Sequence, residues 1–302
     1  MTERAGILAA VVSSGLGGVA AAVTRFVIGG TDPITLAAFR FGLGFLFLLP
    51  IALARPRRWP PRQDWLAVAA LGLLFFAVFF VLFNVSLTHT TAARGALALS
   101  TLPLLTMVVA AALGVERLTT RKTTGVLIAV GGVAVALAAG VAHAPAGAWR
   151  GDLVMVAGAF CMAGYSVWAR PFIGRSGPLT FTTAGMGVGA AALALLAWGT
   201  GGFAAAERFG PREWTAIGYL GVFGAALVFY LWAFALERTT PTRVSSTITV
   251  NPVTASIVAA LLLGEPIGLN LIAGVAAVAV GIWIASTDGR GPAPGLLRTS
   301  GD

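Results

Sequence analysis

Side chains that could carry out catalysis are scarce in this sequence. Its 302 residues include one cysteine, two histidines and eleven acids. The acids fall in loops, in the tails or at the ends of long apolar runs. No group of residues has the spacing of a metal site, a catalytic triad or a phosphate-binding glycine loop. The sequence therefore predicts neither an enzyme nor a bound cofactor or metal, and the single cysteine, Cys161, predicts no disulfide.

The remaining polar side chains suit the binding of a small solute. A cluster of them surrounds two prolines inside the apolar runs, and its members are Ser100, Thr101, Thr249 and Asn251, with Pro103 and Pro252 among them. An amide in hydrocarbon costs free energy unless it faces a partner or a cavity, so we expect Asn251 to line a substrate cavity; bonding between helices is the alternative. Each proline removes a backbone hydrogen bond, which predicts gating hinges, or otherwise static kinks.

Aromatic side chains follow the same apolar runs. Phe79 and Phe83 are four residues apart and share a helix face. Together with Tyr165, Trp168 and Tyr230, they are expected to wall a pocket that accepts an aromatic solute. Contact with lipid is the alternative, or for Trp168 a place in the interfacial belt, where Trp232 is also expected to lie.

The composition places these residues in a membrane protein. Hydrophobic residues make up 58% of the chain and charged residues 10%, against about 45–50% and 25% in soluble domains. The net charge is +9, but the bases do not gather in one patch, which argues against a nucleic-acid partner. They separate long apolar runs instead, as in a chain that crosses a lipid bilayer many times.

Ten apolar stretches are long enough to span a bilayer as helices, which needs about 20 residues each. They lie near 6–28, 34–54, 65–87, 92–114, 123–141, 153–172, 178–200, 214–236, 243–263 and 268–286. The first exceeds the length of a signal-peptide core and is expected to remain uncleaved. Lysines and arginines number 14 on the side of the termini, five on the other side and one inside a span. The positive-inside rule therefore predicts a multi-pass protein of a bacterial-type inner membrane with both termini in the cytoplasm.

The chain also matches itself. Pairs 149 residues apart are Trp65/Trp214, Thr90/Thr239, Arg94/Arg243, Pro103/Pro252 and Glu116/Glu265, whereas before Trp65 the spacing is 145, as in Arg25/Arg170 and Pro33/Pro178. This divides the chain into a five-helix repeat over 1–145, a second over 146–287 and a flexible cytoplasmic tail over 288–302. Because five crossings is an odd number, the second repeat is expected to be inverted. Inverted repeats are typical of secondary transporters, which bind substrate near the bilayer midplane.

These features resemble the EamA-type, ten-helix branch of the drug/metabolite transporter superfamily. The residues that carry the resemblance are Pro33, Ala37 to Phe41, Pro103, Glu116, Gly125, Gly132, Glu265, Pro266, Gly274 and Gly281. Within this branch the chain is most similar to the YddG-type exporters of aromatic amino acids and methionine. The resemblance implies an all-α basket of helices around a central cavity, lined mainly by spans 1, 3, 4, 6, 8 and 9, with spans 5 and 10 at the periphery.

Arg40 and four glycines are expected to have structural roles. Arg40 is the only base well inside a span. Its recurrence in the family pattern favours a lock between two helices over substrate contact, with snorkelling to the interface as the alternative. The glycine pairs Gly125/Gly132 and Gly274/Gly281 are each seven residues apart and so share a helix face. Such glycines join protomers in the four-helix multidrug relatives, but in this duplicated chain they predict packing between spans 5 and 10 of a monomer.

The scarcity of charge inside the spans, where Arg40 is the one exception, narrows the range of possible substrates. The four-helix multidrug relatives bind cations at a membrane glutamate, and sugar-phosphate carriers of the superfamily place bases in their cavity. With neither feature, the sequence predicts an exporter of hydrophobic or aromatic amino acids (phenylalanine, tryptophan, tyrosine, methionine) or related neutral metabolites, working by alternating access without proton coupling. A carrier of another neutral metabolite or drug, and a channel-like or non-transporting membrane protein, are the alternatives.

Overall fold

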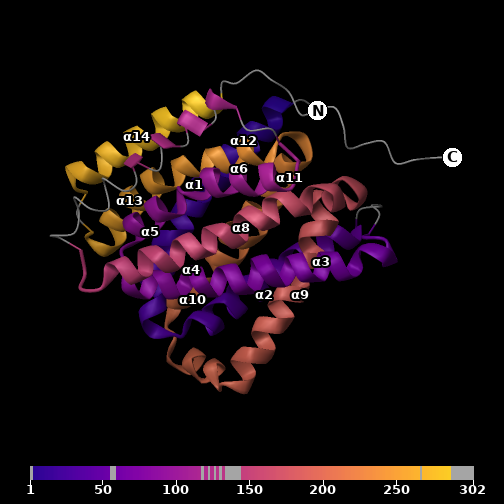
Figure 1. The fold of residues 1–302 in the computed structure, drawn as a ribbon. Helices are drawn as coiled ribbons and strands as arrows, with labels where there is room; N and C mark the ends of the chain where they lie inside the picture. The colour runs from indigo at the N-terminus through magenta and orange to yellow at the C-terminus, as the bar shows by residue number, and fades with distance from the viewer. Residues whose placement is uncertain are drawn as a thin grey trace.

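The computed structural model describes residues 3–54, 59–116, 119–121, 123–125, 127–128, 131–132, 144–265 and 267–286. Within these residues the regular structure is entirely helical (Figure 1). The prediction of an all-α chain is therefore confirmed for the described part. Most of the predicted fifth span, 123–141, and the predicted tail, 288–302, lie outside the described residues.

The helices follow the predicted spans. In the first half they are α1 (Glu3–Val27), η1 (Ile28–Gly30), α2 (Pro33–Ala54), η2 (Arg62–Asp64), α3 (Trp65–Gly72), η3 (Leu73–Phe79), α4 (Phe80–His89), α5 (Ala92–Leu99) and α6 (Leu102–Ala112). In the second half they are α8 (Ala148–Ser176), α9 (Pro178–Gly199), η5 (Gly202–Arg208), α10 (Pro211–Gly221), η6 (Val222–Leu227), α11 (Val228–Arg238), α12 (Pro241–Ser246), η7 (Thr247–Thr249), α13 (Val250–Leu263) and α14 (Leu269–Ser286).

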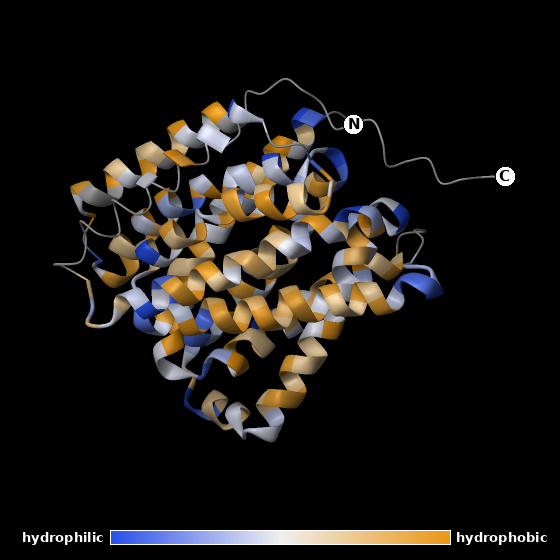
Figure 2. Ribbon diagram, in the orientation of Figure 1, coloured by the Kyte–Doolittle hydropathy of each residue, from blue (hydrophilic) through white to orange (hydrophobic). Residues whose placement is uncertain are grey.

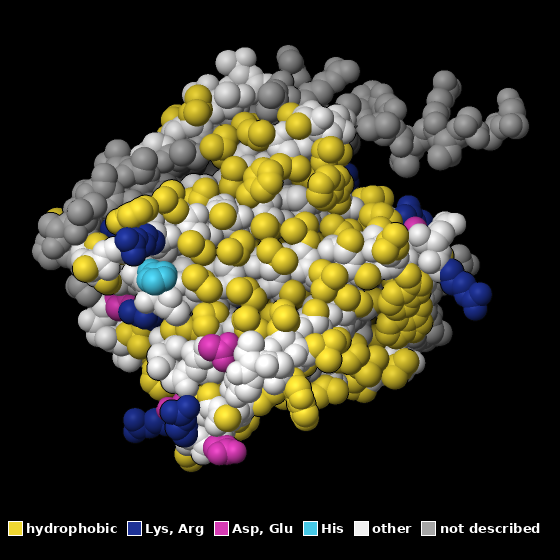
Figure 3. All heavy atoms as spheres, turned by 60° about the horizontal axis from the view of Figure 1, so that its bottom comes forward, with side chains coloured by type: hydrophobic (Ala, Val, Ile, Leu, Met, Phe, Trp, Pro, Cys, Tyr) yellow, Lys and Arg dark blue, Asp and Glu magenta, His cyan; other side chains and the backbone are white. Residues whose placement is uncertain are grey.

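Eight helices or continuous helix runs of the described chain are long and apolar enough to cross a membrane. They correspond to predicted spans 1–4 and 6–9, and α14 covers the predicted tenth. Apolar residues run along the helices, and charged residues gather towards their ends (Figure 2). The outer surface carries a broad apolar area with charged side chains at its margins (Figure 3). Leu66, Trp198 and Leu261 are each at least 80% exposed there, as expected of side chains that face lipid.

Short capping motifs set the ends of several helices. The Asp32 carboxylate accepts hydrogen bonds from the backbone N–H groups of Ile34 and Thr35 at the start of α2. Gly177 turns the chain between α8 and α9 with a φ of +83°, a conformation that glycine adopts without strain. These local signals let consecutive helices reverse direction within one or two residues.

The two halves of the chain are interleaved. Helix α1 packs mainly against α13 and α11 of the second half, and α8 packs mainly against α4 and α6 of the first half. Helices α2 and α9 pack against each other, and each also packs against a helix of the opposite half, α2 against α10 and α9 against α3. Contacts made by one half are thus repeated by the matching helices of the other half.

Two π-helical segments occupy matching positions in the repeat. They are η3 (Leu73–Phe79) and η6 (Val222–Leu227), whose first residues are 149 positions apart. A π-helical stretch widens a helix and weakens its regular backbone bonding, and it is often found at functional sites. The irregularity therefore recurs at corresponding positions of the two halves.

Glycines bring the helix backbones beside these segments into direct contact. A Cβ on Gly72 in α3 would overlap the carbonyl oxygen of Gly185 in α9. A Cβ on Gly189 in α9 would lie 3.0 Å from the Gly72 carbonyl oxygen, and in the matching place a Cβ on Gly44 in α2 would lie 3.1 Å from the carbonyl oxygen of Gly221 in α10. Side chains at these positions would push the halves apart, so glycine is required by the close approach.

The glycines of the predicted spans 5 and 10 lie at a second close contact. A Cβ on Gly132 would overlap Ala277 in α14, and Gly125, Gly274 and Gly281 are buried. Helix α14 lies at the outer edge of the structure (Figure 1). Packing between spans 5 and 10 within one chain requires such an arrangement. This packing remains our interpretation of the four glycines.

Gly72→Ala tests the backbone contact between α3 and α9. We expect the free energy of unfolding to fall by about 1–3 kcal/mol, the usual cost of overpacking, as measured by the thermal unfolding midpoint in detergent. Gly218→Ala in α10 is the matched control, because a Cβ there meets nothing within 4 Å. The control should be neutral or slightly stabilising, since alanine favours a helix. Equal midpoints for the two variants would contradict the close contact.

Candidate substrate cavity

A cavity of about 40 Å³ lies where the two halves meet. Its walls come from both halves, through Ser13, Ser14 and Gly17 of α1, Arg40 of α2, Phe79 of η3, Phe80 and Phe83 of α4, Leu99 of α5, Met162 of α8, Val228, Phe229 and Trp232 of α11, Ile248 of η7 and Asn251 of α13. Pockets that hold drug-sized ligands measure about 300–1,000 Å³. In this conformation the cavity therefore has room for only a few water molecules.

The apolar residues that line the cavity occupy matching positions in the two repeats. Four lining pairs are separated by 149 residues, namely Phe79/Val228, Phe80/Phe229, Phe83/Trp232 and Leu99/Ile248. Corresponding positions in both halves thus face the same space. A cavity built in this way lies between the halves and belongs to neither.

The polar residues of the cavity break this symmetry. Asn251 is 4% exposed, and its Oδ1 atom is buried without a hydrogen-bond partner. The residue 149 positions earlier is Leu102, which is apolar. The Ser13 hydroxyl donates to the carbonyl oxygen of Val228 at 2.8 Å, and Ser14 bonds to Thr247 at 2.9 Å. The polar lining residues therefore come from α1, α2 and α13, and the aromatic ones from η3, α4 and α11.

Arg40 reaches the cavity from α2 and is 2% exposed. Its Nη2 atom donates to the Gly224 carbonyl oxygen in the π-helical segment η6 at 2.5 Å, and Nη1 donates to the Thr24 hydroxyl in α1 at 3.4 Å. The guanidinium carbon lies 4.7 Å from the ring centre of Phe80, within reach of a cation–π attraction. Arg40 thus bridges three helices, as a structural lock requires, and it also lines the cavity, as the less favoured alternative of substrate contact requires.

The structure brings some of the predicted aromatic residues together and separates others. Phe79 and Phe83 line the cavity. Tyr165 lies one layer behind, with its ring stacked on Phe75 at a centroid distance of 4.1 Å. Tyr230 packs against Phe234 instead. Trp168 is 51% exposed on the outer surface, so its assignment to the pocket wall is wrong for this conformation, because its side of α8 faces outward.

The predicted polar cluster is also divided. The hydroxyls of Ser100, Thr101 and Thr249 donate to carbonyl oxygens three or four residues earlier in the chain, and none of the three lines the cavity. Short hydroxyl side chains satisfy themselves in this way on their own helix. Of this cluster only Asn251 faces the cavity. Pro103 and Pro252 lie near the start of α6 and α13, after breaks in spans 4 and 9.

Sequence reasoning missed three aromatic residues of the cavity. Trp232 was expected to lie in an interfacial belt, yet it is 2% exposed, and its indole N–H donates to the Ser166 hydroxyl at 3.3 Å. Phe80 and Phe229 were not considered. The repeat contained the missing signal, because Trp232 and Phe229 lie 149 residues after Phe83 and Phe80.

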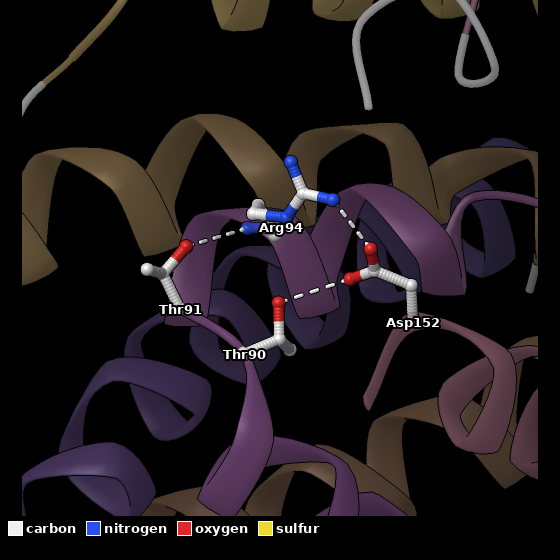
Figure 4. A network of polar contacts seen from close by, with 4 residues as sticks. All are labelled: Thr90, Thr91, Arg94 and Asp152. Carbon is white, nitrogen blue, oxygen red and sulfur yellow. Dashed lines mark hydrogen bonds and ion pairs between the residues drawn. The ribbon is translucent and has the colours of Figure 1, made fainter. Parts of the chain in front are cut away.

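Two ionic clusters at matching positions join helices of the two halves, away from the cavity. In the Asp152 cluster, Thr90 donates to the Asp152 carboxylate at 2.9 Å and Arg94 donates to it at 2.6 Å (Figure 4). In the Glu3 cluster, Thr239 and Arg243 donate to the Glu3 carboxylate. Thr90/Thr239 and Arg94/Arg243 are repeat pairs, and each carboxylate lies near the start of the first helix of its half, α8 or α1. The clusters are therefore equivalent parts of the two halves.

The two clusters lie at opposite ends of α1. Glu3 begins that helix, whereas Arg25 near its other end donates at 3.0 Å to the carbonyl oxygen of Leu87, three residues before Thr90 of the Asp152 cluster. Twenty-five helical residues span about 37 Å at 1.5 Å each, which is close to the full thickness of a bilayer. Each face of the molecule therefore has its own ionic cluster.

A second carboxylate reinforces each end. Glu116 accepts from the backbone N–H of Thr242 at 3.1 Å, and Glu265 accepts from that of Ala92 at 3.4 Å. Each glutamate thus caps a helix of the opposite half, α12 or α5. Burial raises the pKa of the Glu265 carboxyl above its usual value, and its backbone hydrogen bonds and the nearby Arg25 partly oppose this. The glutamates of the sequence motif therefore hold the halves together at their ends and are not part of the cavity.

The fold and the cavity define a multi-pass helical membrane protein with a central site between its two halves. The chain belongs to the EamA-like transporter family, whose model matches residues 4–138 and again residues 149–287. This family is part of the drug/metabolite transporter superfamily, as the sequence resemblance implied. The chain is therefore a member of a transporter family, and its relatives do not carry the names of enzymes.

Several relatives match most of the chain. “Uncharacterized transporter YyaM” of Bacillus subtilis (strain 168) is 26% identical over 87% of this chain and 88% of its own length. “Probable terminal-alkyne amino-acid exporter” of Streptantibioticus cattleyicolor is 30% identical over 76% of this chain and 75% of its own length. “Uncharacterized inner membrane transporter YedA” of Escherichia coli (strain K12) is 26% identical over 87% and 82%. A solved crystal structure has a TM-score of 0.68 at 23% identity, covering 94% of this chain and 96% of its own, which shows a shared fold.

Asp152→Ala tests the Asp152 cluster. The Arg94 and Asp152 side chains are only 12% and 11% exposed, so removal of the carboxylate should lower the free energy of unfolding by about 3 kcal/mol or more. Glu3→Ala is the matched control, because the Arg243 and Glu3 side chains are 32% and 48% exposed, and it should cost about 1 kcal/mol or less. Thermal unfolding in detergent measures both, and an equal loss would contradict the difference in burial.

Proposed function

We propose that this protein is a secondary transporter that exports hydrophobic or aromatic amino acids, or closely related metabolites, across the inner membrane. The observation that carries the proposal is the cavity between the halves, whose lining combines aromatic side chains with Arg40 and Asn251. An amino acid with a large apolar side chain presents the same division, a polar head and an apolar body. The name of the Streptantibioticus cattleyicolor relative supports an amino-acid cargo.

Alternating access is the proposed mechanism. In this proposal the chain forms ten spans in two inverted repeats, acts as a monomer and keeps both termini in the cytoplasm. The cavity is too small for substrate in this conformation, so binding requires one face to open. The Asp152 and Glu3 clusters are suited to hold the two faces shut in turn, because each joins helices of different halves. The breaks before Pro103 and Pro252 are the proposed hinges.

Counterflow in proteoliposomes tests the transport proposal. Vesicles preloaded with unlabelled phenylalanine should accumulate labelled phenylalanine transiently and saturably, with competition by tryptophan and methionine, because a carrier exchanges one bound solute for another. A lipophilic cation measured in parallel should not exchange. Exchange of the cation alone would contradict the amino-acid cargo, and label entry without saturation would favour a channel.

Asn251→Ala tests the polar wall of the cavity. Because the amide is buried with an unpartnered oxygen, its removal should lower the counterflow rate several-fold and leave the folded yield intact. Ser256→Ala is the matched control on α13, because the Ser256 hydroxyl donates to its own helix at Pro252. Its transport should remain at the wild-type rate. Equal transport by Asn251→Ala and wild type would remove Asn251 from the site.

An imposed pH gradient tests the absence of proton coupling. None of the residues that line the cavity is an acid or a histidine, so initial rates at equal substrate gradients should be the same with and without the pH gradient. Glu265, whose carboxyl has a pKa raised by burial, lies outside the spans. Glu265→Gln should therefore also give equal rates. Accumulation of substrate against its gradient, driven by protons, would refute this part of the proposal.

A further inference from the structure

Arg40 is a buried cation for which the described part of the chain supplies no ion pair. The salt bridges among the described residues join Arg94, Arg175, Arg238 and Arg243 to acids and do not include Arg40. Its neighbours are a hydroxyl, a backbone carbonyl and the ring of Phe80. A charge placed away from water is costly unless it is paired. A purely structural role for Arg40 therefore leaves its positive charge without an ionic partner.

The guanidinium retains the donors needed to bind an anion. Arginine has five N–H donors in a planar fork, and the hydrogen bonds to Thr24 and Gly224 use one donor each on Nη1 and Nη2. The Nε atom is buried without a hydrogen-bond partner. A carboxylate that approaches the edge formed by Nε and a terminal nitrogen would receive two parallel hydrogen bonds. The Thr24 and Gly224 contacts would meanwhile hold the fork in place.

Only one of the two halves supplies an arginine with this binding geometry to the cavity. The repeat partner of Arg40 is Gly185, whose surroundings are Gly72 and Phe76. The cavity lining therefore includes a single cation, suited to one negative charge, facing phenylalanines and Trp232. A phosphate dianion would find too little charge there, whereas an uncharged solute would leave the buried guanidinium charge unpaired.

We propose that the Arg40 guanidinium binds the carboxylate of the transported solute, so that the substrates are monocarboxylates with an apolar or aromatic body. The carboxylate is held at the α2 side, and the body lies against Phe79, Phe83 and Trp232. The unpartnered Asn251 Oδ1 on α13 accepts a hydrogen bond from a donor elsewhere on the solute. This inference rests on the proposed function, and it replaces a purely structural role for Arg40 with a role in both packing and recognition.

Competition with four compounds that share one aromatic body tests this inference. Counterflow of labelled phenylalanine in proteoliposomes is measured against unlabelled phenylalanine, 3-phenylpropionate, phenylalaninamide and phenethylamine. The two carboxylates should compete, and the amide and the amine should be at least about tenfold weaker, as expected for loss of a charge-assisted hydrogen-bonded pair. Arg40→Gln should bring acid and amide to equal potency, and Arg40→Lys should retain part of the preference. Arg150→Gln, which alters an exposed arginine, should behave as wild type.

The outcomes separate this inference from the proposed function. If phenylalaninamide competes as well as phenylalanine in the wild-type protein, the role of Arg40 is overturned while transport stands. Unchanged discrimination in a folded Arg40→Gln variant overturns it equally. If phenylalanine does not exchange at all, the proposed function fails and this inference fails with it. Because Arg40 also joins three helices, the wild-type competition decides the question even when the glutamine variant does not fold.

Discussion

Hydrocarbon supplies no hydrogen bonds, and the rest of this structure depends on that constraint. It requires backbone groups to be satisfied within helices, and it explains why the hydroxyls of Ser100, Thr101 and Thr249 bond to their own helices. Most of the charged residues accordingly lie near the ends of the spans, in cross-helix clusters. Against this background, two buried and unsatisfied polar atoms in one cavity, Arg40 Nε and Asn251 Oδ1, are conspicuous. In the proposed function, these are the atoms that a bound solute would satisfy.

The interleaving of the two halves explains how one site can serve two faces. Because α1 packs on α11 and α13 while α8 packs on α4 and α6, the matched walls of the cavity belong to different halves. The Asp152 and Glu3 clusters repeat the same chemistry at the two ends, yet the first is far less exposed than the second. A small difference in packing at the Asp152 cluster can therefore be offset at the Glu3 cluster without new contacts. In the proposed mechanism, this balance lets a carrier have two stable conformations.

Duplication accounts for the shape of the site and divergence accounts for its chemistry. The aromatic and aliphatic walls come from matched positions, but Arg40 and Asn251 face Gly185 and Leu102 in the repeat register. A fully symmetric cavity would bind a solute equally well in two orientations. The unmatched polar residues remove that equivalence and give an amphipathic solute one preferred orientation.

The sequence by itself determined the helical membrane fold, the internal duplication and the family, because long apolar runs, charge bias and matched prolines, glycines and arginines are local or periodic signals. It also placed Phe79, Phe83 and Asn251 at the cavity. Which face of each helix turns inward was decided only by tertiary packing, since an apolar span carries little amphipathic pattern when both lipid and core are apolar. For that reason Trp168 was placed inside and Trp232 outside, although the structure has them the other way round. The dual position of Arg40, bridging three helices and lining the cavity, likewise arises only from the contact between α1, α2 and η6, which are distant in sequence.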